Sequence, residues 1–118
     1  METVKILDKV TFSDKRQTRQ RLIMSDRIEM EMVCYEPGQH TIEHHHVGQD
    51  EIFIIMDGRG AITVDGKTTR VERGSAVFAP ADIKHSVETD EDSRMVMVFV
   101  KAPGRGTRPG RAKAAAAS

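Results

Sequence analysis

The sequence predicts an all-β domain, built as a small antiparallel barrel or sandwich. Its apolar residues fall in short segments separated by turn residues, a pattern typical of these two architectures. Asp65-Gly66 stands between two such segments and favours a tight type I′ hairpin. No stretch shows a convincing helical repeat. With 118 residues, the chain is long enough for one domain with a single core.

Turn residues divide the middle of the chain into seven expected strands. Residues 28–35 alternate in character and end at Pro37-Gly38. Residues 51–56 are apolar on both faces, which predicts a strand that is buried on both sides or lies at a subunit contact. A tight connection is expected at residues 57–60. The other strands are expected at residues 61–64, 67–71, 75–79, 83–89 and 95–101.

The two ends of the chain carry weaker patterns. Residues 1–27 are expected to form an N-terminal segment, in which residues 4–10 could add an edge strand and residues 15–21 a loop or short exposed helix. Residues 28–101 are expected to hold the barrel. Residues 102–118 are expected to be a disordered basic tail, because they are rich in Gly, Pro and Ala and lack larger apolar side chains.

Charge is spread unevenly along the chain, although the formal net charge is zero. Residues 28–100 hold 14 acidic and six basic side chains, a net charge of −8. An acidic body repels a phosphate backbone, which argues against nucleic acid as a partner. No apolar run is long enough to span a bilayer, and no signal-peptide pattern opens the chain. A cytoplasmic protein without a membrane partner is therefore expected.

Histidine and glutamate form the most informative motif of the chain. His44 and His46 share one face of an extended strand, while His45 points to the opposite face. Glu51 begins the next expected strand, and His85 lies in a third. Imidazoles and a carboxylate together are typical ligands of a divalent transition metal. The sequence therefore predicts a metal site made by His44, His46, Glu51 and His85.

The remaining polar candidates lack such spacing. His40 and His45 are expected to lie outside the metal site. Tyr35, Glu43 and His40 are candidates for a general acid or base by residue type alone. No catalytic residue is assigned among them.

Strand alternation also predicts the walls of the pocket. Phe53 and Ile55 share the face of Glu51, and Val87 shares the face of His85. Apolar walls beside a metal would suit a small substrate with an oxygen-bearing end and an apolar portion.

Two stretches of the chain resemble the two conserved motifs of the cupins, over about residues 28–101. The first stretch has the family's residues at the family's spacing: Gly38, His44, His46, Glu51 and Gly58. The second has Gly74, Pro80 and His85. It departs from the family at Asp82, where Gly is frequent, and at Thr89, where Asn is frequent. Both departures affect turn geometry more than metal ligation.

The resemblance implies a jelly-roll barrel, or double-stranded β-helix, of six to eight strands. It implies that His44, His46, Glu51 and His85 bind one divalent metal, with no further cofactor, and that the protein is a homodimer. It leaves the reaction open, because cupins include dioxygenases, decarboxylases, isomerases, lyases and non-catalytic binders.

The leading expectation is a dioxygenase that acts on a small oxygenated metabolite. The alternatives are a metal-dependent isomerase, lyase or decarboxylase, and a non-catalytic cupin that binds a sugar-like small molecule. Fe or Mn would suit dioxygen chemistry, and Zn or Ni would suit the other reactions.

Overall fold

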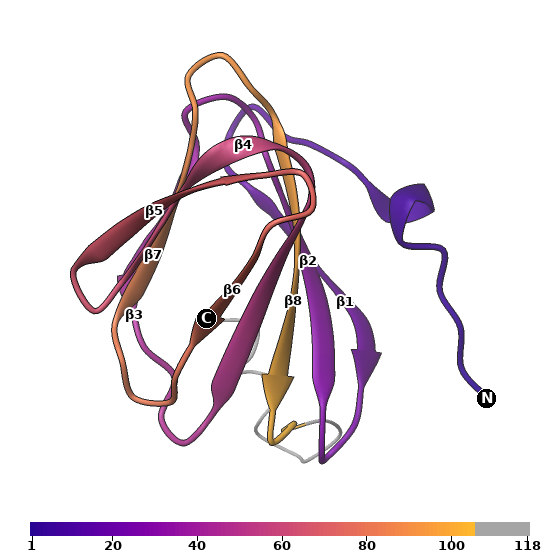
Figure 1. The fold of residues 1–118 in the computed structure, drawn as a ribbon. Helices are drawn as coiled ribbons and strands as arrows, with labels where there is room; N and C mark the ends of the chain where they lie inside the picture. The colour runs from indigo at the N-terminus through magenta and orange to yellow at the C-terminus, as the bar shows by residue number, and fades with distance from the viewer. Residues whose placement is uncertain (106–118) are drawn as a thin grey trace.

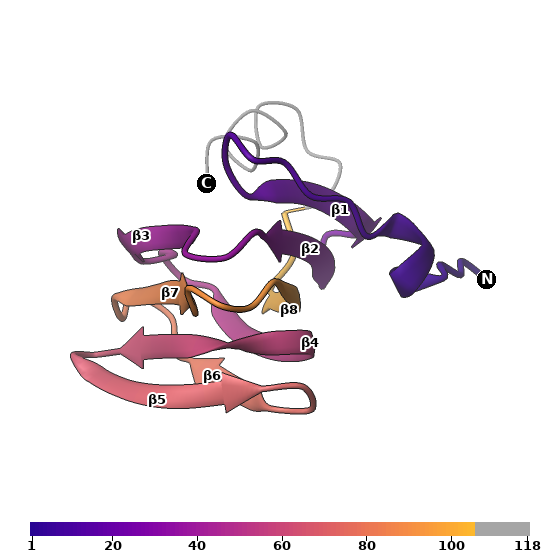
Figure 2. The same cartoon turned by 90° about the horizontal axis from the view of Figure 1, so that it is seen from above.

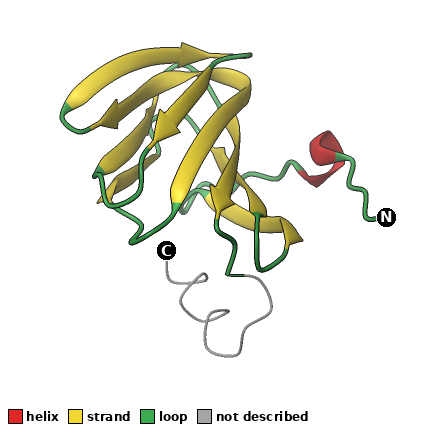
Figure 3. Cartoon of the chain, turned by 60° about the horizontal axis from the view of Figure 1, so that its bottom comes forward, coloured by secondary structure: helices red, strands yellow, loops and turns green. Residues whose placement is uncertain are grey.

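The chain folds into a curled sheet of eight antiparallel strands, preceded by a short 3₁₀ helix (Figures 1 and 3). The computed structural model describes residues 1–105. Within them, no helix is long and apolar enough to cross a membrane. The elements are η1 (Ile6–Lys9), β1 (Thr18–Met24), β2 (Glu29–Tyr35), β3 (His40–His44), β4 (Asp50–Val64), β5 (Lys67–Glu72), β6 (Ala76–Ala79), β7 (His85–Thr89) and β8 (Met95–Ala102). The all-β prediction is confirmed.

The strands form two halves that share β4. The sheet order is β1-β2-β8-β4-β7-β3, and β5 and β6 also pair with β4. The first part of β4 pairs with β6 and β8, whereas its second part pairs with β5 and β7. Figure 1 shows β4 passing from the half that contains β2 and β8 to the half that contains β3, β5 and β7. The curled sheet thereby encloses an interior.

Strand β4 corrects the tight connection expected at residues 57–60. The strand runs unbroken for 15 residues through this stretch. A register shift against β8 bends it just before Gly58, which has a φ of +85°. A Cβ atom at Gly58 would stand 1.7 Å from the carbonyl oxygen of Arg94. The glycine therefore permits a bend and a close approach of two strands, and not a turn.

Apolar side chains fill both faces of the sheet. The interior cluster comprises Val33, Tyr35, Phe53, Ile55, Ile62, Val71, Ala79, Val87, Met95, Met97 and Phe99. A second, outer cluster comprises Met32, Cys34, Val96 and Val98. Strand alternation explains the division, because neighbouring residues of β2 and β8 point to opposite faces. Both faces of these two strands are therefore buried.

The N-terminal segment covers the outer cluster. Figure 2 shows this segment beside β1 and β2. Ile6, Val10 and Phe12 pack against this cluster. The expected edge strand at residues 4–10 is wrong, because these residues include helix η1. The edge strand is β1, in a region expected to be loop or helix. β1 is a strand because it pairs with β2, and the polar sequence of β1 gives no sign of this pairing.

The first residues after the barrel are held against it. β8 ends at Ala102, and the Pro103 carbonyl accepts a 2.9 Å hydrogen bond from the Gln49 side chain. The Arg105 backbone N–H donates to Glu29 at 3.2 Å. The rest of the expected disordered tail, residues 106–118, lies outside the described residues.

Two large apolar side chains lie exposed next to each other on the outer face. Ile52 on β4 and Phe78 on β6 are register partners and are 44% and 56% exposed. Met56, on the same face of β4, packs against the outer cluster instead. The exposed apolar part of this face therefore lies at its Ile52 end, and the second-subunit contact and the homodimer stay predictions.

Ile52→Lys is expected to lower the solution mass from that of a dimer to that of a monomer. The ammonium group would have to be desolvated in an apolar contact between two copies. Light scattering measures the mass, and Leu7→Lys serves as the control, since Leu7 is 63% exposed on η1. A wild-type protein with monomer mass would contradict the prediction.

Candidate metal centre

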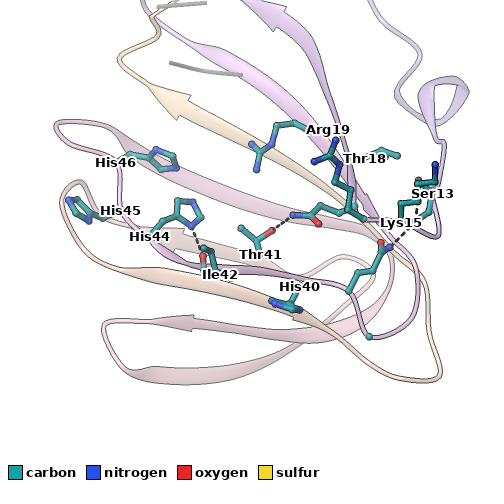
Figure 4. A pocket seen from close by; sticks show the side chains of 14 residues that line it. Ser13, Lys15, Thr18, Arg19, His40, Thr41, Ile42, His44, His45 and His46 are labelled. Carbon is teal, nitrogen blue, oxygen red and sulfur yellow. Dashed lines mark hydrogen bonds between the residues drawn. The ribbon is translucent and has the colours of Figure 1, made fainter. Parts of the chain in front are cut away.

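Three histidines from two strands and a turn come together in the interior. His44 ends β3 and lies opposite His85, the first residue of β7. His46 lies in the turn after β3, so the turn sets its position and not strand alternation. One ligand nitrogen from each histidine lies within 4.8 Å of the other two. These three side chains could hold a metal ion; Figure 4 shows His44 and His46 beside each other.

The loop before β7 holds the turn that carries His46. The Asp82 backbone N–H donates to the His46 carbonyl at 3.0 Å. The Asp82 carboxylate accepts from the Gly48 backbone N–H at 3.1 Å. A hydrogen bond of 2.9 Å from Ala81 N–H to the Asp50 carboxylate ties the same loop to the start of β4. His46 is therefore positioned by contacts between segments far apart in the sequence.

Backbone carbonyls decide which ring nitrogen faces the centre. His44 Nδ1 lies 2.8 Å from the Ile42 oxygen, and His85 Nδ1 lies 3.3 Å from the Ile83 oxygen. A carbonyl only accepts, so each Nδ1 carries the proton and donates it. In a neutral imidazole of this tautomer, Nε2 keeps a free lone pair. This is the tautomer of an imidazole that binds a metal through Nε2.

Glu51 brings a carboxylate to the same place. Its Oε1 lies 3.1 Å from His85 Nε2 and 3.6 Å from His46 Nε2. Glu51 Oε1 and His85 Nε2 are both buried, and neither has a hydrogen-bond partner among the described residues. Their contact at 3.1 Å is favourable when a positive charge lies beside the carboxylate, either a proton on Nε2 or a metal ion. These residues fit a divalent metal ion, which would satisfy both atoms.

The space beside these ligands is small, with polar side chains on one part of its wall and Phe53, Val87, Met97 and Phe99 on the other. It measures about 10 Å³ and is lined by His44, His46 and Glu51, among others. That volume is close to that of a single water-sized particle. Phe53 and Val87 line it as expected, whereas Ile55 is buried in the adjoining core.

The surroundings keep these groups in the forms that a metal requires. Burial lowers the pKa of His44, and burial together with the Lys101 charge lowers the pKa of His46 to about 4. Burial acts to raise the pKa of Glu51, but the contact with His85 and the Lys101 charge outweigh it, so this pKa is lowered. At neutral pH, His44 and His46 are neutral and Glu51 is ionised.

Metal-free protein is expected to lose stability as the pH falls from about 6.5 to about 4. The unfolded chain protonates His46 below its ordinary pKa of 6.5, whereas the folded chain does so only near pH 4. The unfolded state binds more protons in this window, so the free energy of unfolding falls. At the acidic end of this pH range, the lowered pKa of Glu51 also makes the free energy of unfolding fall as the pH falls.

Denaturant unfolding of chelator-treated protein at several pH values measures this dependence. His46→Gln should flatten it, whereas His40→Gln should leave it unchanged because His40 is exposed. A stability of the wild type that is constant from pH 6.5 to 4 would contradict the prediction.

The other candidates named from the sequence lie in different surroundings. His40, His45 and Glu43 are exposed, and none belongs to the cluster. Tyr35 is fully buried, lines the small space, and its hydroxyl lies 2.8 Å from the Thr41 hydroxyl. Burial raises the pKa of Tyr35 to about 12, so its phenol stays protonated.

A buried group of charges beside the centre was not predicted. Lys101 is 3% exposed, and its Nζ lies 3.4 Å from Glu31 Oε2. Arg19 Nη1 lies 3.8 Å from the same oxygen. Both cations lie over the Phe99 ring, at 5.0 Å and 5.2 Å from its centre. Alternation along β8 could have indicated Lys101, since it shares the face of Phe99; nothing in the sequence indicated Arg19.

Residues 31–101 match the family model for the cupin domain. The chain is a cupin. Its fold resembles an uncharacterised protein from Klebsiella pneumoniae with a double-stranded β-helix domain, at a TM-score of 0.81 and 18% identity over 90% of this chain and 93% of that one. The expected jelly-roll barrel is therefore confirmed, with eight strands.

Curated relatives match only part of the cupin. An uncharacterised protein of Streptomyces coelicolor is 46% identical over 52 residues, which cover 43% of this chain and 50% of the relative. Acireductone dioxygenase of Bacillus velezensis is 31% identical over 72 residues, which cover 57% of this chain and 40% of that enzyme. The chain thus matches half or less of the length of these relatives.

The cupin's departure at Asp82 has a structural explanation. Asp82 has a φ of +69°, the left-handed conformation in which glycine is favoured. Aspartate tolerates this conformation better than most residues, and its carboxylate is held by Gly48. The turn therefore keeps its shape without glycine.

Proposed function

We propose that this cupin is a metal-dependent enzyme that acts on a small oxygenated metabolite, with a dioxygenase as the leading reaction class. His44, His46, Glu51 and His85 would hold the metal. The observation that carries the proposal is the convergence of ligand nitrogens from His44, His46 and His85 within 4.8 Å of one another, beside the buried pair of Glu51 Oε1 and His85 Nε2 at 3.1 Å. A protein that served only as a scaffold would have little reason to bury this pair.

A divalent metal bound there would supply Lewis acidity and, if it were Fe or Mn, access to dioxygen chemistry. The chain's own residues would do the rest. Ile42 and Ile83 carbonyls hold two imidazoles in the ligating tautomer. Phe53 and Val87 limit water near the centre. Tyr35 keeps its proton at neutral pH and donates or accepts through Thr41.

Partial similarity to acireductone dioxygenase supports the choice of reaction class. That enzyme's matched part covers 57% of this chain, so its substrate does not transfer with it. Fe, Mn, Ni and Zn all remain compatible with three imidazoles and one carboxylate.

Elemental analysis of untagged protein, followed by oxygen uptake with a panel of small oxygenated metabolites, tests the proposal. About one equivalent of divalent metal and oxygen consumption that depends on both substrate and metal are expected. Protein reloaded with Zn serves as the control, because Zn has no redox chemistry. Full metal content without turnover of any panel member, aerobic or anaerobic, would contradict an enzymatic role.

A further inference from the structure

A large groove leads to the metal centre, and its walls carry cations but no carboxylate. The groove has a volume of about 1150 Å³ and lies between residues 13–19 and the β3 region (Figure 4). Lys15, Arg16 and Arg19 line it on one side, and histidines of the 40–46 stretch line it on the other. No Asp or Glu is among its lining residues, although residues 28–100 carry a net charge of −8. Such a groove attracts anions.

Arg19 stands where this groove meets the small interior space. It lines both, as do Thr41, His44 and His46. Its side chain is 23% exposed, and within residues 1–105 its guanidinium has one ion pair, at 3.8 Å, and no hydrogen bond. Most of its five N–H donors are thus available to a ligand that enters by the groove.

A divalent metal at the centre would leave a positive excess around Arg19, because the charges of Arg19, Lys101, Glu31 and ionised Glu51 alone sum to zero. Arg19 and Lys101 share one carboxylate, Glu31, through the same oxygen. Lys101 is nearer to that oxygen and is buried, so Glu31 stays neutralised if Arg19 turns towards a ligand. A bound metal would add its positive charge at the Glu51 end of the space. An anionic ligand would offset the positive charges of Arg19 and of the metal.

We propose that Arg19 binds the carboxylate of an anionic substrate, whose other oxygen-bearing end reaches the metal centre. The substrate class is then a small carboxylic acid with a neighbouring oxygen function. The planar guanidinium matches a carboxylate through two parallel hydrogen bonds, which a lysine does not reproduce. Lys15 and Arg16 attract the anion into the groove, and Arg19 fixes its orientation. The inference rests on the proposed function and deepens it.

Calorimetric titration of Zn-loaded protein with pyruvate, lactate and phenylpyruvate, each against its uncharged methyl ester, tests this assignment. At least one acid is expected to bind at least tenfold more tightly than its ester. Arg19→Gln should remove that preference while leaving metal content and thermal unfolding unchanged, and Arg19→Lys should restore only part of it. Arg73→Gln is the matched control, because Arg73 is exposed and outside the groove.

The outcomes separate the inference from the proposed function. Equal binding of all acids and esters, or an acid preference that survives in Arg19→Gln, would overturn the role of Arg19. An Arg19-dependent acid preference in a protein that never turns over substrate would leave the inference standing and reject the enzyme.

Discussion

Bound metal is expected to fall strongly in each alanine variant of the four clustered residues, His44, His46, Glu51 and His85. Each side chain could supply one ligand atom, since three imidazole nitrogens lie within 4.8 Å of one another and Glu51 Oε1 lies 3.1 Å from one of them. Changes of residues that only support a ligand already cost 10- to 100-fold in metal affinity. Loss of a ligand itself should therefore cost on the order of 100-fold or more. Elemental analysis after dialysis against a dilute metal buffer measures the occupancy.

His45→Ala and His40→Ala are the matched controls, since both histidines are exposed in the same stretch of chain. They should retain about one equivalent of metal. Metal should also stabilise the wild type and the controls and so raise their melting temperatures. The gain in the free energy of unfolding is about 2.7 kcal/mol when the free metal concentration is 100 times the dissociation constant. The four variants should lose this increase. Full occupancy in His85→Ala, or lost occupancy in His45→Ala, would overturn the assignment.

Gly58→Ala is expected to destabilise the fold by about 3–5 kcal/mol, from a backbone overlap and a left-handed φ together. The new Cβ would stand 1.7 Å from the carbonyl oxygen of Arg94, the residue before Met95, which is the register partner of Gly58 in β8. Residue 58 would also keep a φ of +85° with a side chain. A fall in melting temperature of at least ~10 °C follows for a domain of this size.

Gly74→Ala separates the two causes. Gly74 has a φ of +90°, but a Cβ there would meet nothing within 4 Å. The substitution should cost only the conformational part, about 1–2 kcal/mol. Thermal unfolding of both variants, read with the wild type, makes the comparison. Equal losses at the two positions would show that the approach of β4 to β8 does not limit what residue 58 can be.

The sequence by itself determined the fold class and the residues that meet at the centre. Alternation and turn residues are local signals, so most strands from β2 to β8 fall near their expected ranges. The spacing of His44, His46, Glu51 and His85 was informative because each lies at or near a strand end that a barrel brings inward. The place of Tyr35 beside the centre was not predicted, since Tyr35 was a candidate by residue type alone.

Tertiary structure decided the features that depend on partners distant in the chain. β4 bends without a break at Gly58, where β8 lies against it. In the sequence, a glycine at this position is equally consistent with a turn and with a bent strand. β1 is a strand because β2 offers a free edge, although its own side chains are polar. Arg19 and Lys101 are drawn inward by Glu31, whose burial reverses the usual rule that charged residues face water. Pairing of strands and of charges is a property of the assembled barrel, and no single segment encodes it.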